Sequence, residues 1–71
     1  MNQINPRKLL NSKWTASKVV NKEKHFLVSD IEFNEENEVV SCILEAIISK
    51  RETDIDWREL SNSERWIQGW K

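Results

Sequence analysis

Residues 39–48 have the sequence VVSCILEAII, and their conformation decides which fold the chain adopts. Every second residue from Val40 to Ile48 is apolar, which is the pattern of one face of a strand. Apolar pairs also recur every four residues, and acids precede the segment while bases follow it, as a helix dipole favours. Five of the ten residues are β-branched, and these lose rotamer freedom in a helix. The pattern therefore favours a strand over 39–50, with a helix as the alternative.

The segments around it also have strand patterns. In residues 25–33 (HFLVSDIEF), the expected core side carries His25, Leu27, Ile31 and Phe33, and the other side carries Phe26, Val28, Asp30 and Glu32. Residues 53–58 (TDIDWR) alternate strictly, as in a strand with one wet face. Residues 13–20 are rich in strand-favouring Trp, Thr and Val. Short polar segments between these strands predict hairpin turns.

Both ends of the chain have helix signals. Asn5-Pro6 is typical of a helix start, so a helical turn is expected over 6–10. Ser61 and Glu64 have the spacing of a capping box, which predicts a helix over 62–68. Such a helix would place Trp66 and Trp70 on one face, because residues four apart are neighbours on a helix.

These elements predict one α+β domain over residues 1–71: a small antiparallel β-meander of three or four strands, with an N-terminal helical turn and a short C-terminal helix. An SH3-like partial barrel is one way to close such a meander. The chain has 71 residues, near the lower limit for a self-supporting core. Four Trp and two Phe could supply most of that core, since each buries about 150–250 Å².

The net charge of −1 hides an uneven distribution. Residues 1–25 carry six bases against Glu23 alone, a net +5, whereas residues 26–45 carry six acids and no base, a net −6. The bases are Arg7, Lys8, Lys13, Lys18, Lys22 and Lys24; the acids are Asp30, Glu32, Glu35, Glu36, Glu38 and Glu45. Either the two halves meet and neutralise each other, or a basic face is offered to an anionic partner.

The composition argues against several classes of protein. One Cys and one His cannot form an internal disulfide or a zinc site, and one Gly cannot form a phosphate-binding loop. No apolar run resembles a signal peptide or reaches the about 20 residues that span a bilayer, so we expect a cytoplasmic protein without membrane contact. Cys42 with His25, and Asp54 with Asp56, are weak catalytic candidates whose structural roles are favoured. We therefore expect no enzyme, no metal and no cofactor.

Five stretches of the chain together resemble a small family of tryptophan-rich bacterial proteins of unknown function: NPRKLLNSKWTA, NKEKHF, LEAIISKR, DIDWREL and RWIQGWK. The similarity covers nearly the whole chain. The resemblance implies a short, self-contained bacterial protein and supplies no activity, cofactor or site.

The expected function is non-catalytic binding of a macromolecule. A protein partner, or a second copy in a homodimer, would dock on an apolar patch formed by Phe26, Val28, Ile43 and Ile47, unless the N-terminal turn with Leu9 and Leu10 or the C-terminal helix covers that face. The alternative is RNA or single-stranded DNA, bound by a basic surface that contains Trp. The expected contact residues are Lys13, Trp14, Lys18, Arg58 and Arg65. An exposed Trp beside Lys or Arg would favour nucleic acid, whereas four buried rings and a bare aliphatic patch would favour protein.

Overall fold

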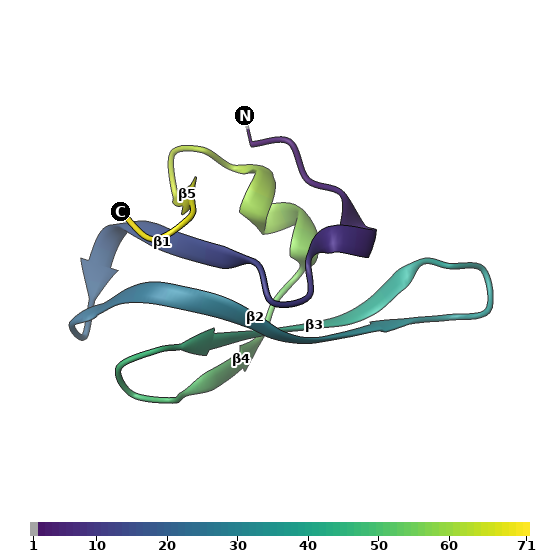
Figure 1. The fold of residues 1–71 in the computed structure, drawn as a ribbon, viewed down its shortest axis with the longest axis horizontal. Coiled ribbons are helices and arrows are strands. Elements are labelled where there is room, and N and C mark those ends of the chain that lie inside the picture. Colours follow the sequence, from purple (N-terminus) through teal and green to yellow (C-terminus); the bar gives the residue numbers. More distant parts are fainter. Residues whose placement is uncertain (1) are drawn as a thin grey trace.

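A computed structural model describes residues 2–71 as one curled, five-stranded antiparallel sheet in the order β4-β3-β2-β1-β5 (Figure 1). The strands are β1 (Lys13–Val20), β2 (Glu23–Phe33), β3 (Val39–Ala46), β4 (Glu52–Asp54) and β5 (Trp66–Gln68). Two short 3-10 helices, η1 (Pro6–Lys8) and η2 (Trp57–Ser61), complete the described residues, which contain no α-helix. The predicted α+β class is therefore wrong. The sheet is open, with β4 and β5 as its edges.

The predicted C-terminal helix is replaced by a turn and a strand. The Ser61 hydroxyl donates to the carbonyl of Arg58 at 2.6 Å, so it closes η2 and caps no new helix. The Asn62 side chain accepts from the backbone N–H of Glu64 at 3.0 Å and forms a tight turn. Trp66 then pairs with Ala16 of β1. The free edge of β1 thus outweighs the local capping signal.

The remaining predictions are mostly confirmed. Strand β1 matches residues 13–20, β2 contains 25–33, and 39–46 form a strand rather than a helix. The strand predicted over 39–50 is too long, because residues 47–49 form a turn in which the N–H of Lys50 donates to the carbonyl of Ala46. The predicted strand 53–58 ends at Asp54, because the Asp56 side chain accepts from the N–H of Arg58 and starts η2. The N-terminal turn is present as η1, with the Asn5 side chain accepting from the N–H of Arg7.

A bulge in β2 reverses the expected faces of the strand before Asp30, whereas Ile31, beyond the bulge, faces the core as expected. The register between β2 and β3 shifts between Val28 and Asp30, so one extra residue is inserted there. Val28 is 0% exposed and Phe26 packs against the core, as does Ile31 beyond the bulge. The apolar patch expected around Phe26 and Val28 therefore does not exist on the second face.

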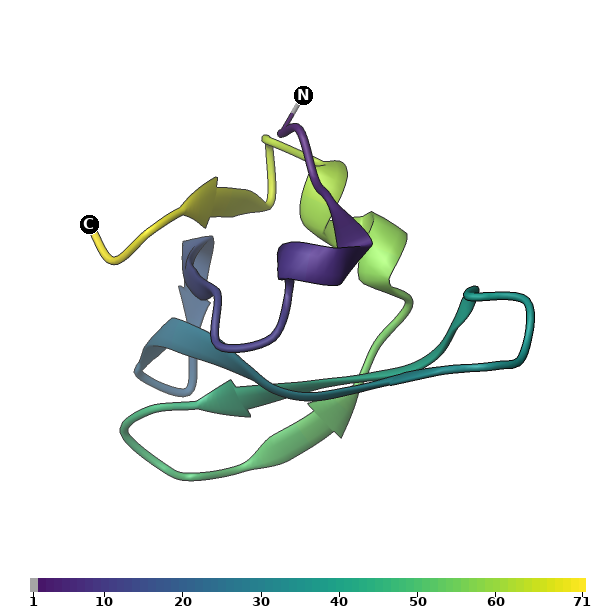
Figure 2. The same cartoon turned by 45° about the vertical axis from the view of Figure 1, so that its right-hand side comes forward.

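The core fills the concave side of the curled sheet, beneath η1 and η2, which lie together over it in Figure 2. Its buried members are Leu9, Trp14, Val28, Cys42, Leu44, Leu60 and Trp66. The segment before η1 is bonded to the end of η2, since the backbone N–H of Asn2 donates to the carbonyl of Ser61 at 2.9 Å. Trp57 is half-buried and Trp70 is 44% exposed, so two of the four indoles form the core.

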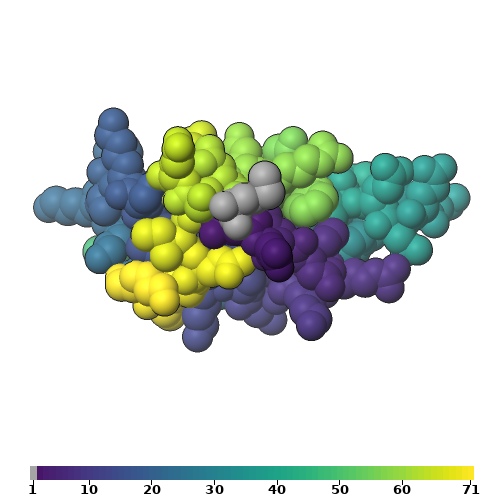
Figure 3. Space-filling model, turned by 90° about the horizontal axis from the view of Figure 1, so that it is seen from above, coloured from purple at the N-terminus to yellow at the C-terminus, as the bar shows by residue number. Residues whose placement is uncertain are grey.

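The basic and acidic segments pair directly, Trp14 of β1 with Phe26 of β2, but their charged hairpins lie apart. We call residues 18–24 the basic hairpin and residues 32–38 the acidic hairpin. They occupy opposite ends of a molecule 37 Å long, as the blue and teal ends of Figure 3 show. Within residues 2–71, no ion pair joins a base of the N-terminal group to an acid of the 26–45 group. Of the two alternatives left open by the sequence, neutralisation of the two halves by ion pairs is therefore wrong for this part of the chain. None of the helices in this part of the chain is long and apolar enough to span a membrane.

Candidate functional site

The basic hairpin is a tight two-residue connection between β1 and β2. Asn21 and Lys22 have φ angles of 55° and 63°, as in the type I′ turn that suits the twist of two strands. Val20 pairs with Glu23 across this turn. The turn leaves Lys18, Lys22 and Lys24 exposed at one end of the molecule.

An ion pair between the buried Glu23 and the exposed Arg51 fixes the hairpin to the β3–β4 turn. Arg51 donates from Nη2 to Oε1 of Glu23 at 2.5 Å and from Nε to Oε2 at 3.1 Å. The Ser49 hydroxyl donates to Oε2 at 2.5 Å. These bonds, with Arg51 as the main cause, lower the pKa of Glu23 to about 2. Both carboxylate oxygens of Glu23 are therefore hydrogen-bonded within the fold, and its negative charge is paired with Arg51.

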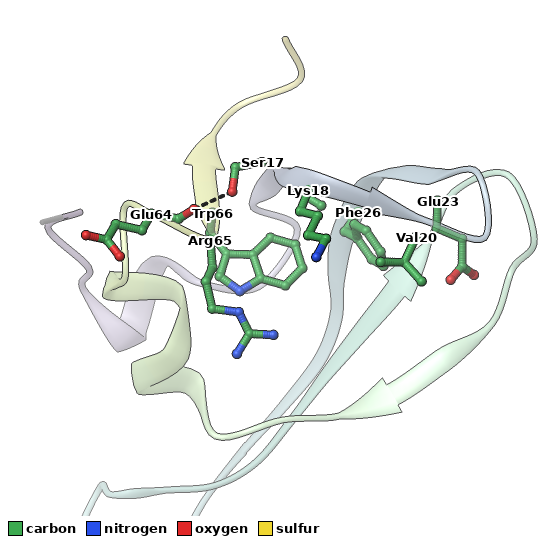
Figure 4. A pocket seen from close by; sticks show the side chains of 9 residues that line it. Ser17, Lys18, Val20, Glu23, Phe26, Glu64, Arg65 and Trp66 are labelled. Carbon is green, nitrogen blue, oxygen red and sulfur yellow. Dashed lines mark hydrogen bonds between the residues drawn. The ribbon is translucent and has the colours of Figure 1, made fainter.

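A groove of about 400 Å³ opens between the basic hairpin and the turn before β5 (Figure 4). Its apolar lining comes from Ala16, Val20, Phe26 and Trp66, and its polar lining from Ser17, Lys18, Glu23, Glu64 and Arg65. The Ser17 hydroxyl donates to the carbonyl of Glu64, which holds the two walls together. The groove thus brings together two of the predicted contact residues, Lys18 and Arg65.

Trp66 forms one wall of this groove and has an unusual hydrogen-bonding state. Its ring meets Phe26 edge to face, with centroids 5.2 Å apart and planes at 89°. The residue is only 9% exposed, and its Nε1 has no hydrogen-bond partner. It is the only such buried side-chain atom within residues 2–71. A buried N–H without an acceptor costs about 1–3 kcal/mol.

Trp70 forms a second feature on the other face of β1. Lys13 lies over its ring, with Nζ 4.9 Å from the centroid, and the His25 ring lies 6.0 Å away. Its Nε1 donates to the carbonyl of Phe26 at 2.9 Å. Thr15 holds the segment in place by donating to the carbonyl of Gly69 and accepting from the N–H of Lys71. The indole is therefore fixed, yet exposed.

Two of the predicted contact residues lie elsewhere. Trp14 is 2% exposed and donates to the Ser12 hydroxyl at 2.8 Å, so its ring belongs to the core. Arg58 lies on η2, outside the groove, with its Cζ 5.7 Å from the centroid of the Trp57 ring. The sequence reasoning missed Trp70 because it assigned that residue to a buried helix face. The Gly69-Trp70 pair was the available signal, since Gly69 has a φ of 83°, which bends the chain out of β5.

A family model described as tryptophan-rich protein (DUF2389) matches residues 12–71. The chain belongs to this tryptophan-rich family. The resemblance seen in the sequence is thereby confirmed. No curated protein and no solved structure matches the chain.

In this member of the tryptophan-rich family, the weak catalytic candidates do not converge. Cys42 is buried on the core face, and His25 lies on the opposite face of the sheet beside Trp70. Burial, reinforced by Asp54 and Asp56, raises the pKa of the Cys42 thiol to about 11. A thiol with this pKa is a poor nucleophile at neutral pH. Within residues 2–71, no group of three or more His, Cys, Asp or Glu residues is placed to hold a metal ion.

Proposed function

We propose that this protein is a non-catalytic binding domain for RNA or single-stranded DNA. The observation that carries the proposal is Trp70, an exposed indole fixed beside Lys13 near the basic end of the molecule. Single-strand binders combine cations that follow the backbone with aromatic rings on which bases stack. Stacking on one ring contributes about 1–3 kcal/mol. Trp70 and Lys13 supply both elements at one place.

The acidic pI of 5.8 is compatible with this proposal because the charges are separated in space. The acidic hairpin lies at the far end of a 37 Å molecule, whereas screening at physiological salt acts over about 8 Å. A strand bound near the basic hairpin is therefore largely screened from the acidic residues. Lys18, Lys22, Lys24 and Lys71 surround the basic end and are all exposed.

A protein partner is the weaker proposal. Its expected patch has lost Phe26 and Val28 to the core, and Ile43 and Ile47 are half-buried. The exposed Val19 and Val20 lie on the basic hairpin, and Val40 lies beside the acidic hairpin. These side chains are on different elements at different ends and support no single docking face. A cytoplasmic location in a bacterium is part of the favoured proposal.

The test is a fluorescence titration of the full chain with a short oligothymidylate. We expect quenching of Trp emission, weakened strongly when salt rises from about 50 to about 200 mM. Trp70→Ala should remove most of the quenching, and Lys13→Ala should weaken binding. Arg7→Ala is the matched control, because it removes an exposed base of η1 that is not part of the Lys13–Trp70 pair. Absence of quenching at low salt, or capture of a protein with no response to the oligonucleotide, would overturn the proposal.

A further inference from the structure

The groove beside the basic hairpin has the dimensions and lining of a small-ligand site. Its volume of about 400 Å³ lies within the range of roughly 300–1,000 Å³ typical of such sites. Phe26, Trp66 and Ala16 make an apolar wall on which a flat heterocycle can lie. An apolar wall alone identifies no ligand, so the polar groups around it must decide.

Those polar groups select an anion. Lys18 and Arg65 line the groove, and neither forms an ion pair with a carboxylate within residues 2–71. Glu23 is occupied by Arg51 and Ser49. The Glu64 carboxylate projects away from both cations, as Figure 4 shows. The groove therefore presents two positive side chains whose charge is unmatched inside the fold.

The indole of Trp66 supplies an independent sign of a missing partner. This residue is nine-tenths buried, and its Nε1 finds no acceptor in the fold. In Figure 4, the nitrogen edge of the ring and the Arg65 guanidinium lie on the same side of the groove. Arg65 is exposed and unpaired, so its side chain can move to admit an acceptor. An oxygen placed there would satisfy the indole N–H and meet the guanidinium at once.

We infer that this groove is a nucleotide pocket: a base lies against Phe26 and Trp66, a phosphate meets Lys18 and Arg65, and a ligand oxygen accepts from the Trp66 indole. The inference rests on the proposed function and deepens it. It separates a pocket for one nucleotide from the stacking surface at Trp70, which lies on the other face of β1. A single nucleic-acid strand that contacts both would pass around the edge of the sheet at β5.

The test uses the indole N–H signals of the full chain in nitrogen–proton correlation spectra. Adenosine monophosphate and inorganic phosphate are titrated separately, and Trp66→Phe assigns the Trp66 signal. We expect the nucleotide to shift the Trp66 signal saturably, phosphate alone to bind more weakly, and the Trp14 signal to stay in place because Ser12 already accepts from it.

Charge variants then separate the groove from its surroundings. Lys18→Ala combined with Arg65→Ala should weaken nucleotide binding on the order of tenfold, since each charge-assisted hydrogen bond to phosphate is strong. Arg7→Ala combined with Lys8→Ala removes the same charge outside the groove and should leave binding unchanged. Trp66→Phe keeps an aromatic wall and should weaken binding, and its melting temperature, measured alongside, shows how much the smaller ring also loosens the core.

Four outcomes would overturn the inference. If an oligonucleotide shifts Trp70 and leaves Trp66 in place, the pocket fails while the proposed function stands. If neither signal moves, both fail. Equal shifts with phosphate and with the nucleotide would reduce the groove to an anion site without a base. A Trp66 shift that depends only on protein concentration would mean that a second copy fills the groove.

Discussion

The two hairpins at the ends of the molecule share a topology and differ in what holds them. The basic hairpin is fixed from outside by the Arg51–Glu23 pair and by the bond from Ser17 to the turn before β5. The acidic hairpin is held by its own turn, where the Asn34 side chain accepts from the N–H groups of Glu36 and Glu38, both at 2.9 Å. Only the first hairpin borders a groove with unmatched charge. Under the proposed function, the fixed basic end is the part of the fold that contacts the ligand, whereas the acidic end is a solvated arm.

The largest expected contrast is in stability. Leu60, the buried residue of η2, is 0% exposed, so Leu60→Ala should lower the free energy of unfolding by about 2–5 kcal/mol. Val40, beside the acidic hairpin, is 59% exposed, and Val40→Ala should change it by less than about 0.5 kcal/mol. Urea denaturation of both variants measures the difference. Equal losses would mean that the acidic arm belongs to the cooperative core.

The sheet was largely predictable because alternation and β-branching are local signals. Residues 39–46 illustrate this, since their β-branched content favours a strand whatever the partner strand is. The bulge after Val28 was not predictable, because it depends on how β2 and β3 curl around the core. Strand β5 was missed for a related reason: the edge of β1 that it covers is created only when the sheet forms.

The candidate site was predictable in part. Lys18 was chosen for its basic segment and Arg65 as the neighbour of Trp66, and the fold brings these two residues to one groove, although they are distant in sequence. The same reasoning chose Trp14 because it lies among lysines, yet alternation turns its ring into the core. Composition can thus indicate which residue types a site needs. Whether a given side chain is exposed depends on the face of the strand to which it points, and a bulge changes that face.

Charge reversal at each end tests whether the two hairpins differ in binding. Lys22→Glu combined with Lys24→Glu should weaken oligonucleotide binding on the order of tenfold at low salt, because phosphate contacts dominate such affinity. Glu35→Lys combined with Glu36→Lys changes the net charge by the same amount in the opposite sense, at the distant end. Fluorescence titrations should show a much smaller effect for this second pair. An equally large gain would mean that net charge alone, and not the position of the basic hairpin, governs binding.

The anchor of the basic hairpin predicts a pH dependence of stability. The pKa of Glu23 is lowered to about 2, from an ordinary value near 4.5, mainly by Arg51. A lowered folded-state pKa stabilises the fold above pH 4.5, and this contribution is lost as pH falls from about 4.5 to about 2. Arg51→Met should lower the melting temperature at neutral pH and flatten its decline in this acidic range.

Lys50→Met is the matched control for the anchor, because Lys50 meets Glu45 only at 3.9 Å and is largely exposed. Melting curves of the three proteins between pH 7 and pH 2 should separate them. A wild-type acid profile that survives Arg51→Met would show that other carboxylates dominate acid unfolding.

The smallest expected effect compares the two turns through their left-handed residues. Lys22 has a φ of 63°, a conformation that costs a residue with a Cβ about 1–2 kcal/mol. Lys22→Gly removes this cost but increases the conformational freedom of the unfolded chain, so we expect the free energy of unfolding to rise by about 0.5 kcal/mol. Asn37, in the acidic hairpin, has the same φ of 63°, but Asn tolerates it well, so Asn37→Gly should be neutral or slightly destabilising. Denaturation midpoints of both variants decide the matter, and a larger gain at Asn37 would mean that the acidic turn carries more strain than the basic one.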